Sequence, residues 1–431
     1  MEGGALSDMN LKRLFGLRSA NLENDSFAEK TVSLSSSDSI RRPDWILLVA
    51  TVALMVIGVM FIYSARMVSE SHLSWYQTNA FRQCIWYLIG TGLAVGICVF
   101  DYKTLCRFSF IAYWGAIFIL ILVLIPHVGT YRFGARRWID LGILQFQPSE
   151  FAKLAYLFAL ANYLEKPKEE LRSYRVFLRA MSMMGLPFLL ILAEPDLGSA
   201  LVFIPSGLIV MYVADVPIRY LAKVAGIGFL LISLLVIDVV FAPEGWRLPL
   251  EDYQKRRLLV YFNQSYVNEK TPPEDRQRLA QLEEADSYNI EQALISVGSG
   301  GFIGKGWKEG TQTSLGFLPR AVAHNDFIFS VIAEETGFLG SSIVIGLYGI
   351  IFFAGLRTAT QARERMGRLL AVGTVTLLFS HVMINIGMNI RLMPVTGIPL
   401  PLLSYGGSSV ICSLLAIGIL QSISIYRRKY N

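Results

Sequence analysis

Residues 44–65 read DWILLVATVALMVIGVMFIYSA, and this apolar run decides the class of fold. An α-helix needs about 20 predominantly apolar residues to cross the hydrocarbon of a bilayer, and this run has that length. Comparable runs recur along the 431-residue chain, in which 53% of the residues are hydrophobic and only 17% are charged. Since a soluble protein of this size carries about 25% charged residues, the sequence predicts an integral membrane protein.

We predict an all-α, polytopic membrane protein with ten transmembrane helices and a large extracytoplasmic loop, residues 243–325, between the seventh and eighth helices. The predicted helices are residues 44–65, 83–100, 108–126, 148–164, 176–194, 198–215, 220–242, 326–356, 369–389 and 408–426. Together they form one membrane domain, residues 44–426. Residues 1–43 are polar and lack periodicity, so we expect a disordered cytoplasmic tail without a cleavable signal peptide. Residues 427–431 form a basic cytoplasmic tail.

Basic residues at the ends of these segments predict their orientation. Most lie on one side of the membrane if both termini are cytoplasmic, as expected from the enrichment of lysine and arginine in cytoplasmic loops. This side carries Arg41, Arg42, Lys103, Arg107, Lys166, Lys168, Arg172, Arg175, Arg219, Lys223, Arg357, Arg363, Arg365, Arg368, Arg427, Arg428 and Lys429. The net charge of +6 follows from this bias, so we predict no nucleic-acid partner. Arg136 and Arg137 lie on the opposite side, where a basic pair is unfavoured.

Cysteines and histidines give no pattern of a metal site or a disulfide. The four cysteines lie in or beside apolar segments without CxxC spacing, so we expect small buried hydrophobic side chains. The four histidines are scattered, and neither HxxxH nor HExxH occurs, which argues against a histidine-built zinc site. These residues are Cys84, Cys98, Cys106, Cys412, His72, His127, His324 and His381.

The long loop contains three segments of different composition. Residues 252–263, DYQKRRLLVYFN, place three basic residues beside a run of apolar ones, which suits a helix lying in the headgroup layer. Residues 264–288 are charged and mixed, and we expect a solvated excursion. Residues 298–335 read GSGGFIGKGWKEGTQTSLGFLPRAVAHNDFIFSVIAEE and lead from a glycine-rich basic loop into an apolar helix. This third segment carries the candidate site.

Asp326 stands where this loop meets the eighth apolar segment. One interpretation is a helix N-cap, in which Asp326 or Asn325 satisfies free backbone N–H groups for about 0.5–2 kcal/mol. The other is a general base, because a carboxylate at the boundary between lipid and water is well placed to take a proton from a sugar hydroxyl. Glu334 and Glu335 lie two to three turns further into the segment. We expect them to stabilise helix contacts or a polar cavity rather than to catalyse.

Glycines surround Lys305 in the same loop. Glycine lets backbone N–H groups approach a phosphate closely, so Lys305, Gln312 and Arg320 are candidate substrate-binding residues. The spacing matches neither a P-loop nor a dinucleotide fingerprint, and it follows no strand of a βαβ unit. The pattern therefore does not support nucleotide binding.

Two further places combine charge with an unusual position. Glu150 and Lys153 lie on one face of the fourth segment. They form either a snorkelling ion pair at the membrane edge or a pair that faces a cavity, since exposing them to lipid would be costly. Asp196 lies at a break between two apolar runs. Either a tight outer turn or a role in substrate binding explains an acidic residue at this position.

Two outer loops add candidates of their own. In GARRWIDLG, Arg136 and Arg137 are placed to hold a diphosphate, and Trp138 either stacks on a sugar or anchors the loop at the interface. The last outer loop, residues 389–409, reads NIRLMPVTGIPLPLLSYGGSS. Non-helical backbone is tolerated at membrane depth only where it is buried in protein or lines a cavity.

These segments together resemble the SEDS family (shape, elongation, division and sporulation), the bacterial cell-wall polymerases typified by RodA and FtsW. The matching motifs, in family order, are GARRWIDLG with FQPSEFAKLA, EPDLGSALV, GSGGFIGKGWKEGTQTSLGFLP, DFIFSVIAEETG and GIPLPLLSYGGSS. They run from about Arg136 to Ser409 and cover nearly all of the membrane region. GIPLPLLSYGG is closer to the RodA branch than to the division branch. The chain departs from the family pattern at His324-Asn325 and in the length of the 264–288 excursion.

The resemblance implies a peptidoglycan glycosyltransferase, a hexosyltransferase that joins lipid II disaccharides into glycan strands for elongation and cell shape. It would be a multi-pass protein working at the outer face of the bacterial cytoplasmic (inner) membrane. Asp326 matches the family's essential outer-loop aspartate, Glu150 and Lys153 its functional pair, and Trp138 its loop tryptophan. The implied partner is a class B penicillin-binding protein, a monofunctional transpeptidase.

The resemblance also suggests a mechanism, to which two alternatives exist. Asp326 would deprotonate the acceptor hydroxyl of lipid II, which attacks an undecaprenyl-linked glycan and releases undecaprenyl diphosphate with inversion. The cations that would stabilise the leaving group are Lys153, Arg136, Arg137, Lys305 and Arg320, with a divalent cation (Mg²⁺ or Mn²⁺) as an open cofactor. The alternatives are a lipid II flippase or transporter, which predicts coupling residues near the bilayer midplane, and a non-catalytic scaffold for the transpeptidase.

Overall fold

The computed structural model describes residues 43–426 with short gaps. The gaps are residue 127 and residues 133–134, 141, 143–144, 242–251, 263–272 and 319–321. Both predicted tails, apart from Pro43, lie outside the described residues, as do His127, Arg320 and the first part of the 264–288 segment. The predictions made for them stay predictions.

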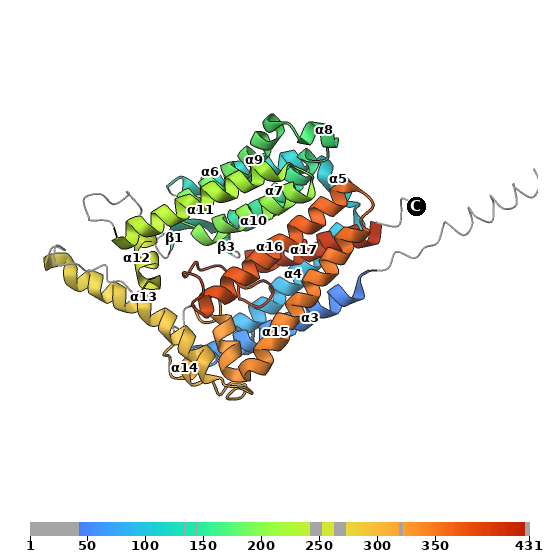
Figure 1. Ribbon diagram of the computed structural model, residues 1–431. Coiled ribbons are helices and arrows are strands. Elements are labelled where there is room, and N and C mark those ends of the chain that lie inside the picture. The colour runs from blue at the N-terminus through green and yellow to red at the C-terminus, as the bar shows by residue number, and fades with distance from the viewer. Residues whose placement is uncertain are drawn as a thin grey trace, which may run out of the picture. The chain divides into compact units, whose positions relative to one another are not determined.

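Each predicted apolar segment is occupied by a helix whose ends differ from the predicted ones by a few residues. These helices are α3 (Trp45–Arg66), α4 (Asn79–Val99), α6 (Ser109–Leu124), α7 (Pro148–Tyr163), α9 (Tyr174–Ala193), α10 (Leu197–Val213), α11 (Ile218–Phe241), α15 (Ile328–Gln361), α16 (Arg365–Asn389) and α17 (Gly407–Tyr426). Within the described residues, 7 helices are long and apolar enough to cross a membrane, and α6 and α10 are shorter apolar helices. The chain is mostly helical, as Figure 1 shows.

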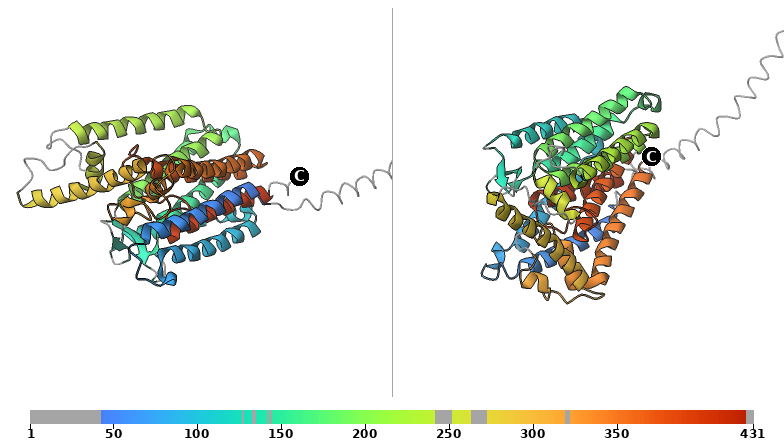
Figure 2. Two further views of the ribbon diagram at one scale, coloured as in Figure 1. Left: turned by 90° about the horizontal axis from the view of Figure 1, so that it is seen from below. Right: turned by 60° about the vertical axis from the view of Figure 1, so that its left-hand side comes forward.

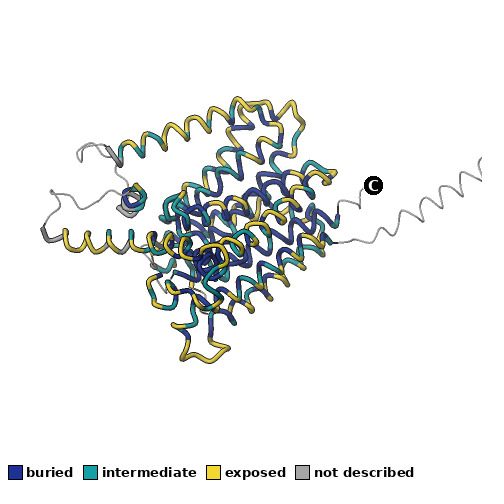
Figure 3. Tube along the Cα trace, turned by 60° about the horizontal axis from the view of Figure 1, so that its bottom comes forward, coloured by how far each residue is buried: buried dark blue, intermediate teal, exposed yellow. Residues whose placement is uncertain are grey.

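The two helices α16 and α17 form the centre of the described part of the chain. Their apolar stretches are 83% and 89% buried, whereas that of α11 is only 6% buried. Helix α17 packs on α4, α16 packs on α10 and α15, and α15 packs on α3 (Figure 1, Figure 2). Figure 3 shows buried residues along the inner helices and exposed ones along the outer faces. Many exposed side chains on these outer faces are large and apolar, which suits contact with lipid.

Helix α15 consists of two helical parts joined at a sharp turn. Gly337 has a φ of 65° and a ψ of −161°, a conformation that glycine adopts without strain. A Cβ at Gly337 would lie 2.4 Å from the backbone nitrogen of Gly304, so the two chain segments approach closely because both residues lack side chains. The prediction of one continuous eighth helix is therefore wrong. Glu334 and Glu335 precede the break and do not lie deep inside a spanning helix.

The loop between α6 and α7 forms a small antiparallel sheet, which the all-α prediction missed. Its strands are β1 (Thr130–Arg132), β2 (Ala135–Asp140) and β3 (Gln145–Phe146), paired in the order β1-β2-β3. The pairing steps from Trp138 to Arg136 across consecutive residues of β1, so Arg137 is the extra residue of a β-bulge. Bulges re-aim a side chain, and this one directs Arg137 away from the regular alternation of the strand.

Two helices follow α11 in the long loop. Helix α12 (Asp252–Tyr261) occupies the segment that was predicted to be an amphipathic helix, and α13 (Pro273–Ser299) covers most of the expected excursion. The described side chains of α13 before Ile290 are mostly exposed, so this segment is solvated but helical. Helix α13 packs on α15. The remaining short helices are η1 (Trp75–Gln77), α5 (Tyr102–Arg107), α8 (Lys168–Leu171) and α14 (Thr311–Ser314).

The cysteines follow the expectation in part. All four are free thiols, and Cys106 and Cys412 are buried among the helices as expected. Cys98 is partly buried, whereas Cys84 is exposed, so the expectation of a buried side chain is wrong at Cys84. Its position on α4, a helix with many exposed apolar side chains, explains the exposure.

Candidate active site

Asp326 lies two residues before the first residue of α15, Ile328, and beside the last outer loop. Its Oδ2 atom is 3.5 Å from the position that a Cβ on Gly397 would take. The N-cap residue of α15 is Phe327, and no side chain caps this helix, so the N-cap interpretation of Asp326 and Asn325 is wrong. The half-buried Asp326 carboxylate is not committed to the helix and is available for chemistry.

Burial and three charged side chains set the protonation of Asp326. Burial raises the pKa of this carboxyl to about 6, Arg257 and Arg137 oppose that rise, and Asp196 adds to it. A general base works best when its pKa lies near the operating pH, because it is then ionised and still able to hold a proton. Asp326 meets this requirement better than an ordinary aspartate, whose pKa is about 3.9.

Two neighbouring groups stay neutral at physiological pH. Burial, followed by the charge of Arg66, lowers the pKa of His324 to about 3. Burial and nearby Asp196 raise the pKa of Glu194 to about 9, against the effect of Arg137. A titration near pH 6 is ordinarily assigned to a histidine, but His324 does not take up a proton in that range. Asp196, rather than Glu194, carries the negative charge that Arg137 faces.

The turn between α9 and α10 holds Arg137 at the site. The Arg137 guanidinium donates to the backbone carbonyls of Glu194 (3.3 Å) and Pro195, and its Nη1 lies 3.8 Å from Asp196 Oδ1. Asp196 also caps α10 by accepting from the Ser199 backbone N–H at 3.1 Å. The tight-turn interpretation of Asp196 is confirmed, and its contact with substrate stays a prediction.

Arg257 of α12 is a site cation that the sequence analysis missed. Its Nη1 donates to the backbone carbonyl of Thr396 at 3.3 Å, and among the charged groups it has the largest effect on Asp326. The basic run at 255–257 was expected in the headgroup layer, and nothing in that run indicates which residue faces inward. Arg136 and Trp138 are half-buried on β2, close in sequence to Arg137.

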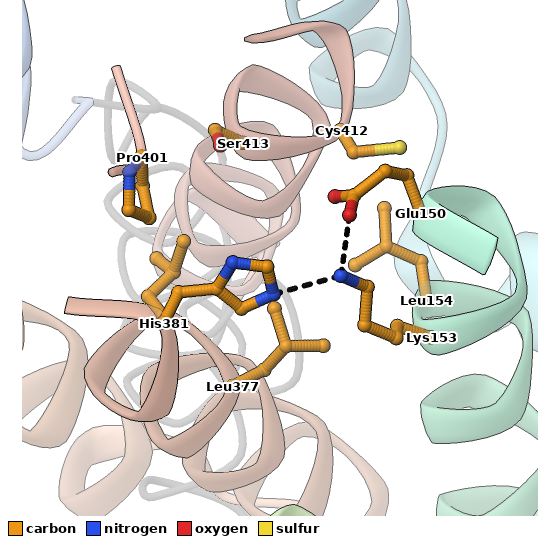
Figure 4. A pocket seen from close by; sticks show the side chains of 9 residues that line it. Glu150, Lys153, Leu154, Leu377, His381, Pro401, Cys412 and Ser413 are labelled. Carbon is orange, nitrogen blue, oxygen red and sulfur yellow. Dashed lines mark hydrogen bonds and ion pairs between the residues drawn. The ribbon is translucent and has the colours of Figure 1, made fainter. Parts of the chain in front are cut away.

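Glu150 and Lys153 of α7 form a buried ion pair that His381 of α16 completes (Figure 4). Lys153 Nζ lies 2.6 Å from Glu150 Oε1 and 2.8 Å from His381 Nε2. The three residues are 3%, 1% and 3% exposed in chain order. Because a charged lysine only donates, His381 accepts through Nε2 with a neutral ring. The interpretation as a snorkelling pair is wrong, and the interpretation as a pair facing a cavity is supported.

The cavity beside this cluster is small. Its volume of about 10 Å³ is roughly the room that one water molecule requires. Figure 4 shows the side chains of Glu150, Lys153 and His381 pointing toward one another from two helices, with Cys412 and Pro401 on the lining. A diphosphate does not fit this space. Lys153 is committed to protein partners here, although its predicted role toward substrate stays a prediction.

The structure brings Lys305 and Gln312 together around Glu334. Lys305 Nζ lies 2.6 Å from Glu334 Oε1, and the Gln312 backbone N–H donates to the same oxygen at 2.9 Å. Glu335 accepts from the Ser64 hydroxyl of α3, which ties the start of α15 to the first helix. The expectation that these acids stabilise contacts is confirmed. Arg320 lies outside the described residues.

We expect Lys305→Met to lower the thermal stability of the protein. Glu334 is fully buried, and losing its cation removes a charged hydrogen bond worth about 1.5–3 kcal/mol, while Thr311 and Gln312 still donate. The measurement is thermal unfolding of the purified protein by intrinsic fluorescence. Lys308→Met is the control in the same loop and should lower the Tm less, because the Lys308 ammonium lies over the Trp307 ring at 4.3 Å and acts on buried Glu335 through its charge without an ion-pair contact. Equal Tm values for the two variants would contradict the assignment.

The described residues do not form a divalent cation site. Within the described ranges, no three or more His, Cys, Asp or Glu side chains gather closely enough to hold an ion. At Asp326 the neighbouring carboxylate, Asp196, is already shared between Arg137 and the α10 cap. This donor set does not fit Mg²⁺ or Mn²⁺, which prefer several oxygen ligands in octahedral geometry.

The sequence is similar to a known protein family and to several of its members. A family model described as "Cell cycle protein", covering FtsW, RodA and SpoVE, matches residues 45–429. The peptidoglycan glycosyltransferase MrdB of Escherichia coli (strain K12) is 37% identical over 313 residues, which cover 72% of this chain and 76% of MrdB. The peptidoglycan glycosyltransferase RodA of Treponema pallidum (strain Nichols) is 33% identical and covers 88% of this chain and 97% of that protein.

A solved structure has the same arrangement of helices. It bears the description "Structural coordination of polymerization and crosslinking by a peptidoglycan synthase complex". One of its chains is 29% identical, with a TM-score of 0.69, and covers 90% of this chain and 98% of its own length. The region matched by the family model includes Asp326, Arg137 and Arg257, as well as the Glu150–Lys153–His381 cluster.

Proposed function

The chain belongs to the FtsW, RodA and SpoVE family, and from this membership we propose that it is a peptidoglycan glycosyltransferase serving cell elongation and shape. It joins lipid II disaccharides into glycan strands and releases undecaprenyl diphosphate. The observation that carries the proposal is the half-buried carboxylate of Asp326. It does not cap α15, and its pKa is about 6 in the presence of the positive charges of Arg137 and Arg257.

Asp326 is the general base of the proposed reaction. It takes the proton from the acceptor hydroxyl as that oxygen forms a bond to the anomeric carbon of the donor glycan. The bond between this carbon and the diphosphate oxygen breaks at the same time, and undecaprenyl diphosphate leaves with the bonding electrons. Attack on the face opposite the leaving group inverts the anomeric centre.

Arginines supply the positive charge that the departing diphosphate requires. Arg137 and Arg257 are both fixed by backbone carbonyls, so their charges are in place before the reaction begins. A guanidinium presents several donors in a planar fork that suits phosphate oxygens. Arg136, Trp138 and Arg320 are further candidates for the diphosphate and the sugars.

Lys153 and Lys305 support the structure around the site and do not contact the reacting groups in this proposal. Lys153 pairs with buried Glu150, and Lys305 pairs with buried Glu334, so neither charge is free in this arrangement. Lys153 supports the packing of α7 against α16, and Lys305 holds the glycine-rich loop that leads to the base. Gln312 contributes to the same loop through its backbone.

The proposed enzyme crosses the bacterial cytoplasmic membrane ten times, with both termini in the cytoplasm and Asp326 at the outer face. Its partner is a class B penicillin-binding protein, whose transpeptidase activity crosslinks the new strands. The likeness to a chain of a peptidoglycan synthase complex supports such a partner. The candidate spans identified by length and composition support the membrane assignment.

Polymerisation of lipid II by the purified protein tests this function. The protein is reconstituted in bilayers with and without the transpeptidase partner, and glycan products are separated on a gel. A ladder of strands that requires this chain supports the enzyme. Transfer of lipid II between leaflets without strands would indicate a flippase, and strand formation by the partner alone would indicate a scaffold.

We expect kcat/KM for polymerisation to rise with pH and to level off above an apparent pKa near 6. Below that value Asp326 is protonated and cannot accept a proton, so the rate should fall about tenfold per pH unit. The measurement is a set of initial rates from pH 5 to 8. His324→Gln should show the same fall of kcat/KM at low pH, because His324 is neutral throughout the range. If kcat/KM of His324→Gln no longer fell at low pH, the assignment to Asp326 would be contradicted.

A further inference from the structure

Two asparagines of α16 contact the backbone of Asp326. We propose that Asn385 and Asn389 are positioning residues, which hold the backbone of Asp326 so that its carboxylate meets the acceptor hydroxyl. The inference rests on the proposed function for the role of Asp326. It adds two side chains that neither touch the substrate nor carry charge.

Asn385 connects the two outer loops that meet at the site. Its Nδ2 donates to the Asp326 carbonyl at 3.0 Å and to the Ile398 carbonyl at 2.8 Å. One amide group thus connects Asp326, near the start of α15, with Ile398 in the loop after α16. Asn385 is 0% exposed, so water does not compete for these hydrogen bonds.

Asn389 lies one helical turn after Asn385 and reinforces the same carbonyl. Its Nδ2 donates to the Asp326 carbonyl at 3.1 Å and to the Asn385 carbonyl at 2.8 Å. Its Oδ1 accepts from the Ser330 hydroxyl of α15 at 2.6 Å. Because carbonyls surround the nitrogen and a hydroxyl faces the oxygen, the surroundings fix the orientation of this amide.

The backbone carbonyls of His324 and Asn325 also accept hydrogen bonds. The Tyr405 backbone N–H donates to the His324 carbonyl at 3.0 Å, and the Ser404 hydroxyl donates to the Asn325 carbonyl at 2.6 Å. Three consecutive carbonyls therefore have donors from the last outer loop or from α16. Only the third, that of the base itself, receives side-chain amides.

This clamp explains how an irregular segment keeps a base in place. Misplacing a reacting group by about 1 Å costs on the order of 10²-fold in rate. Burial is the main cause of the raised pKa of Asp326, and freeing its carbonyl would let the carboxylate move toward water. The charged groups around it are Arg257 from α12 and Arg137 from β2, which lower this pKa, and Asp196 at the start of α10, which raises it. Because burial is the largest of these effects, the pKa would fall from about 6 toward the ordinary value of about 3.9.

The test compares Asn385→Leu with Asn162→Leu in the full chain reconstituted in bilayers. Asn162 is the matched control, because its Nδ2 also donates to two groups, the Cys106 carbonyl and the Ser109 hydroxyl, which do not contact Asp326. We expect Asn385→Leu to lower kcat for polymerisation about 10²-fold with KM little changed. Asn162→Leu should keep wild-type kcat, even where its Tm falls equally. Asn389→Leu should have a smaller effect in the same direction.

A second measurement does not depend on polymerisation. Dicyclohexylcarbodiimide modifies protonated carboxyls in apolar surroundings, and mass spectrometry of the Asp326 peptide gives the extent of modification at each pH. We expect a midpoint near pH 6 in wild type and Asn162→Leu, and a clearly lower midpoint in Asn385→Leu. If wild type makes no strands but the midpoint still shifts, the clamp stands and the proposed function fails. Unchanged midpoint and kcat in Asn385→Leu, or equal changes in Asn162→Leu, would overturn the proposal.

Discussion

Purified Asp326→Ala is expected to polymerise lipid II about 10²–10⁴-fold more slowly than wild type, with its fold intact. Alanine removes the group that accepts the hydroxyl proton, while Arg137 and Arg257 stay in place to hold the diphosphate. Binding of lipid II should therefore weaken far less than turnover. The measurement is the initial rate of strand formation on a gel with the transpeptidase partner present, together with KM for lipid II.

Two further variants sharpen this prediction. Asp326→Glu keeps a base but moves it by one methylene, so we expect an intermediate rate. Asp140→Ala removes an exposed carboxylate from β2 and should leave the rate near that of wild type. A wild-type rate in Asp326→Ala would show that another group, or none, acts as the base.

Lys153→Met is expected to destabilise the protein by about 3–5 kcal/mol, the usual cost of leaving one partner of a buried ion pair alone. Among the described residues, the Glu150 carboxylate has an ion pair with Lys153 alone, and it would lose this partner in a cluster that is almost completely buried. His381 cannot replace the lysine, because burial disfavours a charged ring. The measurement is thermal or denaturant unfolding of the purified protein in detergent.

The double variant Glu150→Gln/Lys153→Met provides the control. It removes both charges, so it should recover much of the stability that Lys153→Met loses, because no buried charge is left unpaired. Activity need not recover with stability, and a stable but inactive double variant would indicate a role of the pair in the reaction. A double variant less stable than Lys153→Met would contradict the pairing.

The helices could be predicted from sequence because the bilayer imposes a length and a polarity on each spanning segment. The ends of α7 and α17 lie within a residue of the predicted ones. The break at Gly337 could not be predicted in this way, because hydropathy depends on composition and carries no information on backbone dihedral angles. The small sheet was missed for a similar reason, as its strands are too short to show an alternating pattern.

The site was predictable only where one residue carries an unusual charge. Asp326 stood out as an acid at the edge of an apolar segment, and its proposed role followed from the family resemblance of the motif around it. The proposed roles of Arg257 and Asn385 depend on how α12 and α16 pack, and their neighbours in sequence have similar character. Lys305 looked like a phosphate ligand because its carboxylate partner, Glu334, lies in another segment and the glycine turns bring the two together.

The turn at Gly337 also shortens the straight part of α15, which would otherwise be much longer than a bilayer is thick. An unbroken α15 of 34 residues would be about 51 Å long at 1.5 Å per residue, against a hydrocarbon layer of about 30 Å. The part after Gly337 is about 36 Å long, which a moderate tilt accommodates. A side chain at this position would clash with the backbone of Phe302 and Gly304, and the positive φ of Gly337 would strain any other residue. The absence of a Cβ at Gly337 thereby limits the length of the straight helix that follows and leaves Glu334 and Glu335 in the buried segment before it.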